Sequence, residues 1–535
     1  MKVYLFLSGL FLNLCLFGQN KYISSVSIPD STKKINKDSA TQFAEIIQAS
    51  EMKRMVYYLA SDSCEGRELG TKGNDRAADY IAHEIEQNGI PKFGLNPSYF
   101  QPVNFKWISW DNIKLSINDF EYKHMWDYLS IPRENKNLNV NTDEIVFLGY
   151  GIETSKYNDY KNLNLKDKVI LIYNGEPTTK EGKSYLTGSS IPSSWSLNLD
   201  LKLDAAKRHG VKCILIIEDK FKELVDLNRL KVLSPTVVLD IDEKPENEIV
   251  NVLHLSPWVT TKLLGSSLKK LIKTRDKIKR TGRPQSLVIK TKLGIEQHKL
   301  EQQVIGRNIL AYIEGSDKKD EVLIISAHYD HIGMRGKDVF NGADDNASGT
   351  TTVTQIAKAM QYAKSIGKGP RRSVLCLLVT GEEKGLLGSM YYVNNPVFPL
   401  SSTIADINID MVGRIDDKYK PNGNYVYVIG SDRLSSKLHE YNESINAQYS
   451  HIIMDYTYNA ENDINRYYYR SDHYNFAEKL IPAIFFFNGT HEDYHRIGDD
   501  PEKIDFNKME KIGRHIFLLA WKLANAEKRI SVDRK

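Results

Sequence analysis

Short apolar runs alternate with amphipathic segments along the C-terminal half of the chain. Apolar runs of four to eight residues bounded by turn residues are typical of buried strands, whereas apolar residues spaced three and four apart are typical of helices. We therefore expect helices at 349–362 and 510–523, and strands at 308–314, 322–327, 373–380, 404–409, 426–429 and 482–487. Strands that alternate with helices predict an α/β fold, a three-layer sandwich around a mixed, mostly parallel central sheet.

Two regions with other patterns precede this one. Residues 40–89 have a helical pattern that is interrupted by the turn-rich segment Cys64–Gly70. From about Val103 the pattern changes to short strands, among them 144–148, 168–173 and 212–217, with a helix at 201–209 and a basic, solvated helix face or linker at 269–280. This change of pattern predicts a strand-rich region between the two others.

The chain begins with Met1-Lys2, followed by an apolar run from Val3 to Phe17 and the small residue Gly18. One positive charge, a short apolar stretch and a small residue predict a secretory signal peptide at 1–19, with a polar leader at 20–40. We therefore expect a secreted or periplasmic protein. No later apolar run reaches the length of a membrane span, so no stable membrane insertion is expected.

Composition narrows the possible functions. The chain has 535 residues, 41% of them hydrophobic and 26% charged, which is typical of soluble globular proteins. Its 72 Lys and Arg against 68 Asp and Glu argue against nucleic acid as the partner, because such proteins carry a basic excess or patch. Cleavage of the signal peptide would leave Cys64, Cys213 and Cys376, too few for a disulfide scaffold. Cys376 is predicted to be a small core residue.

Histidine and carboxylate side chains follow one predicted strand after another. They are His328 and Asp330 after 322–327, Asp344 and Asp345 in the loop before 349–362, Glu382 and Glu383 after 373–380, Asp410 after 404–409, and His491 and His495 after 482–487. Ligand sites gather at the carboxyl ends of strands in open α/β sheets. So many carboxylates at one sheet edge would repel one another without cations, and divalent metals bind carboxylate and imidazole groups. The sequence therefore predicts a metal site.

These motifs, in this order, resemble those of the M28 family of zinc metallopeptidases. They read His328-Tyr329-Asp330, Gly342-Ala343-Asp344-Asp345-Asn346-Ala347-Ser348-Gly349, Thr380-Gly381-Glu382-Glu383, Asn408-Ile409-Asp410-Met411 and Tyr494-His495. Glu65-Gly66-Arg67 also resembles that family, and the strand-rich region resembles an inserted protease-associated domain. The resemblance implies an N-terminal part of the peptidase domain at 41–105, the insert at 106–300, the catalytic domain at 301–527 and a tail at 528–535.

The resemblance also implies a site with two zinc ions. His328 and Asp410 would hold one ion, Glu383 and His495 the other, and Asp345 would bridge both. Glu382 would act as general base, Tyr494 would donate its hydroxyl to the tetrahedral oxyanion, and Asp330 would accept the second N–H of the His328 imidazole. His331, Ser471, Asp472 and His473 are expected near this site but not as ligands; Ser471-Asp472-His473 precedes a helical run, so it would cap a helix or contact the substrate. The substrate would be a peptide or protein, and an aminopeptidase that removes N-terminal residues is expected.

Three alternatives remain at this point. His491-Glu492-Asp493-Tyr494-His495 has the spacing of the H-E-x-x-H zincin motif, which requires a helix, but it follows a strand and a turn and precedes Gly498 and Pro501. A glutaminyl-cyclase-like acyltransferase uses a similar fold, generally without the insert. A non-catalytic, receptor-like relative would lack ligands, and none is missing here. The sequence leaves the side-chain preference and the oligomeric state open.

Overall fold

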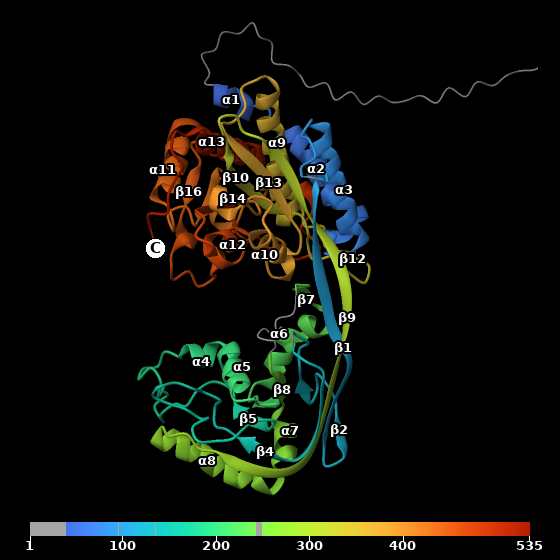
Figure 1. Cartoon of the computed structure of the whole chain (residues 1–535), viewed down its shortest axis with the longest axis vertical. Helices are drawn as coiled ribbons and strands as arrows, with labels where there is room; N and C mark the ends of the chain where they lie inside the picture. The colour runs from blue at the N-terminus through green and yellow to red at the C-terminus, as the bar shows by residue number, and fades with distance from the viewer. Residues whose placement is uncertain (1–38, 95, 134, 242–248, 535) are drawn as a thin grey trace, which may run out of the picture.

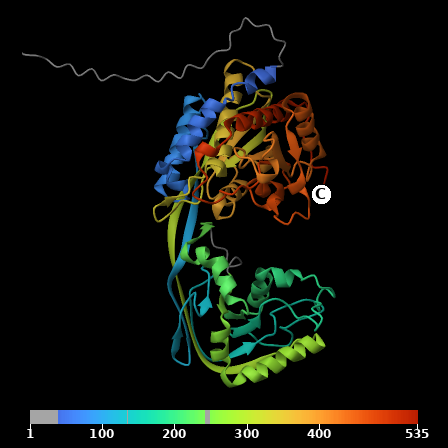
Figure 2. The ribbon, with the colours of Figure 1, turned by 180° about the vertical axis from the view of Figure 1, so that it is seen from behind.

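The chain folds into two lobes that are joined by a pair of long strands (Figure 1). The computed structural model describes residues 39–94, 96–133, 135–241 and 249–534. The predicted signal peptide at 1–19 and nearly all of the predicted leader lie outside these residues. The connecting strands are β1 (Phe100–Ile117) and β9 (Leu287–Ile313), which cross from one lobe to the other in both opposite views (Figures 1 and 2).

The upper lobe contains the predicted mixed sheet. Its strand order is β16-β15-β17-β14-β10-β13-β9, and β17, β14, β10 and β13 are parallel to one another. β9 is antiparallel to β13, and β15 is antiparallel to β17. The bounds are β10 Lys318–His328, β13 Arg372–Val379, β14 Thr403–Ile409, β15 Tyr425–Ile429, β16 Ile453–Asp455 and β17 Ala483–Phe487. Each predicted strand of this region is therefore present.

Helices cover both faces of this sheet. Successive residues of a strand point to opposite faces, so each strand contributes to two cores. Leu323 and Ile325 of β10 lie in one hydrophobic core, and Val322 and Ile324 lie in another. The helices of the first core are α1 (Ser39–Ala44), α2 (Ala49–Leu59), α3 (Lys72–Gln87), α9 (Gly349–Ser365), α11 (Ser436–Ile445) and α13 (Phe506–Asn525). Those of the second are α10 (Leu387–Asn394) and α12 (His473–Glu478). The predicted three-layer α/β sandwich is confirmed.

The lower lobe has hydrophobic cores of its own. Its strands β4, β5, β6 and β8 are parallel neighbours, and β9 is antiparallel to β4. Helices alternate with these strands, which adds helical structure to the strand-rich region that the sequence predicts. The elements are β3 (Tyr128–Leu129), β4 (Leu138–Phe147), β5 (Val169–Tyr173), α4 (Ser194–Leu197), α5 (Leu199–Arg208), β6 (Cys213–Ile217), α6 (Phe221–Leu233), β8 (Asn251–Leu255), α7 (Pro257–Leu264) and α8 (Leu268–Thr281).

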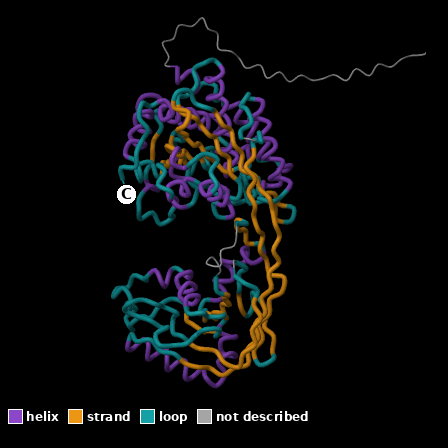
Figure 3. Tube along the Cα trace, viewed as in Figure 1, coloured by secondary structure: helices purple, strands orange, loops and turns teal. Residues whose placement is uncertain are grey.

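The long connecting strands are the main difference from the sequence prediction. β1 and β9 pair from Phe100 opposite Ile309 to Ile117 opposite Leu293, as the continuous strand trace between the lobes shows (Figure 3). The sequence predicted only 308–314 as a strand here. Residues 296–303 are polar at nearly every position and lack the apolar run or strict alternation that identifies a strand. They pair nonetheless, because β1 supplies hydrogen-bonding partners along their whole length.

Two smaller strands extend this ribbon. β2 (Phe120–Tyr122) and β7 (Thr236–Leu239) both pair antiparallel with β1, and the short hairpin β11 (Met334–Arg335) and β12 (Asp338–Val339) stands apart. In the described residues, no helix combines the length and apolar character needed to cross a membrane. Cys64, Cys213 and Cys376 are buried and unpaired, and Cys376 lies in β13 as predicted.

Gly306 allows β9 to pack closely against the side chains of Leu69 and Phe105. A Cβ atom at this position would lie 2.7 Å from Cδ1 of Leu69 and 2.8 Å from Cε2 of Phe105. We expect Gly306→Ala to lower the free energy of unfolding by about 1–3 kcal/mol, because overpacking forces neighbouring side chains to move. Urea unfolding measures this. The control is Ile305→Ala, whose side chain is exposed; equal effects of the two substitutions would contradict the tight contact.

Candidate metal centre and active site

The predicted site residues lie at one edge of the upper sheet. His328 is the last residue of β10, Glu382 and Glu383 follow β13, and Asp410 directly follows β14. Asp345 lies in the segment Ala343–Ser348 before α9, and His495 lies in the loop after β17. Since β10, β13, β14 and β17 are parallel, their carboxyl ends bring these side chains together.

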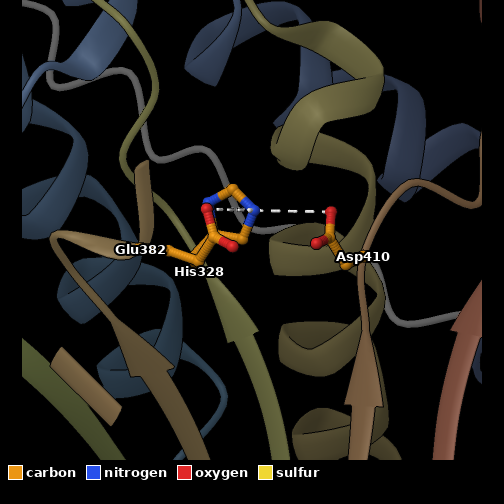
Figure 4. Close-up of side chains that lie close together, drawn as sticks. All are labelled: His328, Glu382 and Asp410. Carbon is orange, nitrogen blue, oxygen red and sulfur yellow. Dashed lines mark ion pairs between the residues drawn. The ribbon is translucent and has the colours of Figure 1, made fainter. Parts of the chain in front are cut away.

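A first group of donors surrounds the buried His328 side chain. Its Nε2 atom lies 3.4 Å from Oδ1 of Asp410 and 3.4 Å from Oδ1 of Asp345. Oε2 of Glu382 is 3.8 Å from the same nitrogen. Figure 4 shows His328 between the carboxylates of Glu382 and Asp410, each on the end of a different strand or the turn after it.

A second group of donors adjoins the first. Nε2 of His495 lies 3.0 Å from Oδ2 of Asp345 and 3.3 Å from Oε2 of Glu383. Oε1 of Glu383 is 2.8 Å from Nδ1 of His331, a residue that was not expected among the ligands. Asp345 therefore directs one carboxylate oxygen into each group.

The chemistry of these donors fits divalent metal ions. Two sets, His328 with Glu382 and Asp410, and His331 with Asp345 and Glu383, each offer ligand atoms within 4.8 Å of one another. Nε2 of His328 and Oδ1 of Asp410 are buried and have no hydrogen-bond partner among the described residues. Buried polar atoms are normally paired. Imidazole nitrogens and carboxylate oxygens are the ligands of zinc, so the residues present can hold it.

The charges of the two groups depend on one another. Burial raises the pKa of Glu382 well above its ordinary value, and the nearby charges of Glu383 and Asp410 raise it further. Burial opposes protonation of His495, yet Asp345 and Glu383 raise its pKa to about 11. The pKa of Glu383 lies well below its ordinary value in spite of burial, because His331 and His495 stabilise the carboxylate. Positive charge is therefore required here, as protons or as a bound cation.

Buried hydrogen bonds orient the loops that carry the ligands. The carboxylate of Asp499 accepts the backbone N–H groups of Asp344 and Asp345, each at 3.1 Å. The carboxylate of Asp330 accepts those of Glu382 at 3.2 Å and Glu383 at 3.4 Å. Asp499 was missed by the sequence analysis, since no motif separates it from the acidic residues of an ordinary turn.

Two predicted details differ in the structure. Nδ1 of His328 is nearer to the backbone oxygen of Asp330, at 3.1 Å, than to its carboxylate, at 3.7 Å. The carboxylate is held by backbone N–H groups instead, so the main chain of Asp330 faces the imidazole. Ser471 was expected as a helix cap or a substrate contact, but its hydroxyl donates to Oδ2 of Asp410 at 2.8 Å and accepts from the Asn408 amide at 2.7 Å.

The H-E-x-x-H segment does not form a zincin helix. Residues 491–495 form a turn, in which the Tyr494 N–H bonds to the His491 carbonyl. Nε2 of His491 lies 3.3 Å from Asp344, away from the two donor groups. The carboxylate of Asp344 also accepts the Gly413 N–H at 2.7 Å and the Asn488 amide at 3.0 Å. Asp344 and His491 thus belong to the frame of the site.

A pocket with aromatic walls opens beside the donor groups. It is lined by the site residues Asp345, Glu382, Asp410 and His495 and by Met411, Tyr467, Arg470, Phe485, Phe487, Thr490 and Tyr494. The Tyr494 ring stacks on His495 with 4.0 Å between ring centroids, and its hydroxyl accepts a long hydrogen bond of 3.4 Å from Arg470. Tyr494 therefore faces the space in which a substrate would contact the donor groups.

Arg67 ties the N-terminal helices to the site. Its side chain is fully buried and donates to four backbone carbonyls, those of Leu59, Tyr329, Asn341 and Gly342, at 2.6–2.8 Å. Next to it, a Cβ atom on Gly66 would lie 2.4 Å from the Gly333 carbonyl oxygen, so only glycine fits this left-handed position. The motif Glu65-Gly66-Arg67 thus holds the two loops that carry His328 and Asp345.

We expect Arg67→Met to lower the free energy of unfolding by about 3 kcal/mol, because it leaves buried carbonyl groups without donors. Chemical denaturation of the purified protein measures this. The matched control is Arg76→Met, whose partly exposed side chain pairs with Glu65 on the surface and whose loss is expected to cost less than about 1 kcal/mol. A similar cost for both substitutions would contradict the role of Arg67.

Comparisons with known proteins agree with this geometry. Residues 308–520 match the model of peptidase family M28. The chain is 25% identical over 262 residues to a probable zinc metalloprotease of Pyricularia oryzae, covering 42% of this chain and 51% of that protein. It is 27% identical over 225 residues to a probable leucine aminopeptidase of Trichophyton verrucosum, covering 40% of this chain and 57% of that protein. The chain thus spans about half of these two relatives, and as little as 11% of another that it matches.

The fold has a counterpart among solved structures. An aminopeptidase from Aneurinibacillus sp. strain AM-1 matches with a TM-score of 0.56 at 17% identity, covering 93% of this chain and 98% of that one. The match therefore extends over both lobes and the ribbon between them. The part of the chain that carries the predicted motifs at one sheet edge, residues 308–520, is therefore similar to peptidase family M28.

Proposed function

We propose that the chain is a zinc-dependent exopeptidase, an aminopeptidase that removes N-terminal residues from peptides or proteins. The observation that carries this proposal is Asp345, whose two carboxylate oxygens face two adjacent groups of imidazole and carboxylate donors. Relatives named as a probable zinc metalloprotease and a probable leucine aminopeptidase support it.

In this proposal the site holds two zinc ions. His328 and Asp410 would hold one ion, Glu383 and His495 would hold the other, and Asp345 would offer one carboxylate oxygen to each. Such a pair of ions polarises a scissile carbonyl and lowers the pKa of a bound water. His331 holds the second oxygen of Glu383 through the 2.8 Å contact, which fixes the carboxylate toward His495.

The remaining steps belong to the protein's own side chains. Glu382 takes a proton from the attacking water and passes it to the leaving amine. Burial and the charges of Glu383 and Asp410 raise the pKa of Glu382, which favours uptake of that proton. The Tyr494 hydroxyl donates to the developing oxyanion from the pocket wall. The ions and the acidic side chains together would bind the free α-amino group of a peptide, which would direct the cut to the N-terminus.

The proposal extends to the organisation of the chain. Residues 41–105 and 301–527 form the peptidase domain, and 106–300 form a protease-associated insert. The hydrophobic cores support this division, because 40–99 and 309–530 share one core whereas 115–295 form another. The predicted signal peptide would deliver the enzyme to the periplasm or the medium. No observation favours the glutaminyl-cyclase-like or receptor-like alternatives.

Substrate and metal requirements test the proposed function together. We expect hydrolysis of aminoacyl anilides but not of the same anilides with an acetylated amine, because the acidic site binds a free amino group. Chelation should abolish the activity and zinc should restore it, with zinc content measured on the same sample. Activity that resists chelators, or equal hydrolysis of blocked and free substrates, would contradict the proposal.

Glu382→Gln separates the general base from the ligands. We expect the variant to retain its zinc and to lose about 100- to 10,000-fold in kcat, the usual range for general acid–base catalysis. The matched control is Glu492→Gln, which changes an exposed glutamate in a nearby loop and should leave kcat unaltered. Loss of zinc in the Glu382 variant would instead identify Glu382 as a ligand, and retention of most of its activity would exclude it as the base.

A further inference from the structure

The lower lobe has a cavity at the carboxyl ends of its parallel strands. The metal centre has the same position in the sheet of the upper lobe. β4, β5 and β6 are parallel, and the cavity lies where their carboxyl ends meet, beside Tyr150 after β4 and Asn174 to Glu176 after β5. Its volume is about 300 Å³, within the range of small-molecule sites. Ligands bind at the carboxyl ends of parallel strands, so this position favours a binding site.

Two cationic side chains of α8 line the cavity. Arg275 and Lys279 are one helical turn apart and both face it. The Arg275 guanidinium lies 4.1 Å from the centre of the Tyr173 ring and 3.5 Å from the exposed Asp219 carboxylate. Its Nε atom is buried and has no hydrogen-bond partner among the described residues. An N–H group that is withdrawn from water and left unpaired indicates a ligand that supplies the acceptor.

The other walls of the cavity are fixed by internal bonds. The carboxylate of Glu176 accepts both the N–H and the hydroxyl of Ser193, so it is already satisfied. Buried Lys202 donates to the Gly175 carbonyl at 2.6 Å, and the Tyr185 hydroxyl donates to the Lys279 carbonyl at 2.8 Å. The loop over the cavity is thereby held against β5 and α8. The Glu176 carboxylate is therefore occupied internally, and the charged side chains that remain in the lining are those of Arg275 and Lys279.

We propose that this cavity binds a small anionic ligand whose carboxylate or phosphate group contacts Arg275 and Lys279. Arginine binds both groups through paired N–H donors, and lysine adds a point charge. The hydroxyls of Ser190 and Ser196 also line the cavity and can donate to the same oxygens. The site is independent of the metal centre, because it lies in the other lobe and shares no residue with it.

Isothermal titration calorimetry of the full chain tests this with three probes: N-acetyl-Ala-Ala, its C-terminal amide, and inorganic phosphate. We expect saturable binding of the peptide acid, of phosphate, or of both, and at least tenfold weaker binding in Arg275→Gln and Lys279→Gln. Lys273→Gln is the matched control, since it removes one exposed charge from the same helix outside the cavity. Circular dichroism and Tm check that each variant is folded, and the two cavity variants test the site separately.

The three probes distinguish the sources of the ligand. Binding of the acid alone assigns a peptide carboxylate, and binding of phosphate alone assigns a free phosphate; either supports the shared chemistry. Anion binding at the metal centre would persist in both cavity variants. The proposal is overturned if no binding depends on Arg275 or Lys279, if the acid and its amide both bind with the same affinity, or if Lys273→Gln loses as much affinity.

Discussion

The repulsion between buried carboxylates governs the upper lobe. Asp345, Glu382, Glu383 and Asp410 come together at one sheet edge, where little water screens them. Such a cluster is stable only if positive charge is placed among its members, and His328, His331 and His495 each have a ring nitrogen within 3.4 Å of one of these carboxylates. The sheet therefore brings like charges together, and the site depends on positive charge that neutralises these carboxylates.

The surroundings of the cluster consist of fixed dipoles and hydrogen bonds. Asp330 and Asp499 each bind two backbone N–H groups of the loops that carry ligands, and Arg67 binds the carbonyls of two such loops. Acidic groups thus face amides and a basic group faces carbonyls, so that each loop is held from its backbone. Two of the predicted ligand side chains are held in the same way, Glu383 by His331 and Asp410 by Ser471.

The sequence predicted the site better than it predicted the frame around it. His328, Glu382 and Asp410 follow apolar strands that local pattern identifies, and the rule for carboxyl ends then brings them together. Arg67 and Asp499 act through backbone groups that are distant in sequence, so no local pattern reveals their partners. The polar stretch 296–303 became a strand only because β1 lies beside it, which is a tertiary effect that overrides local preference. His331 was judged correctly as close to the site, but its contact with Glu383 depends on a loop conformation that spacing does not determine.

The division of the upper core between the two ends of the chain has a consequence for biosynthesis. Helices α1 to α3 are among the first described segments to leave the ribosome, yet they share their core with residues from Ile309 onward. The lower lobe, which is continuous in sequence, can form its core while the peptidase half is still being translated. The apolar faces of the early helices stay uncovered while about two hundred further residues are synthesised. Folding of the nascent chain therefore requires that these faces be protected from aggregation during that interval.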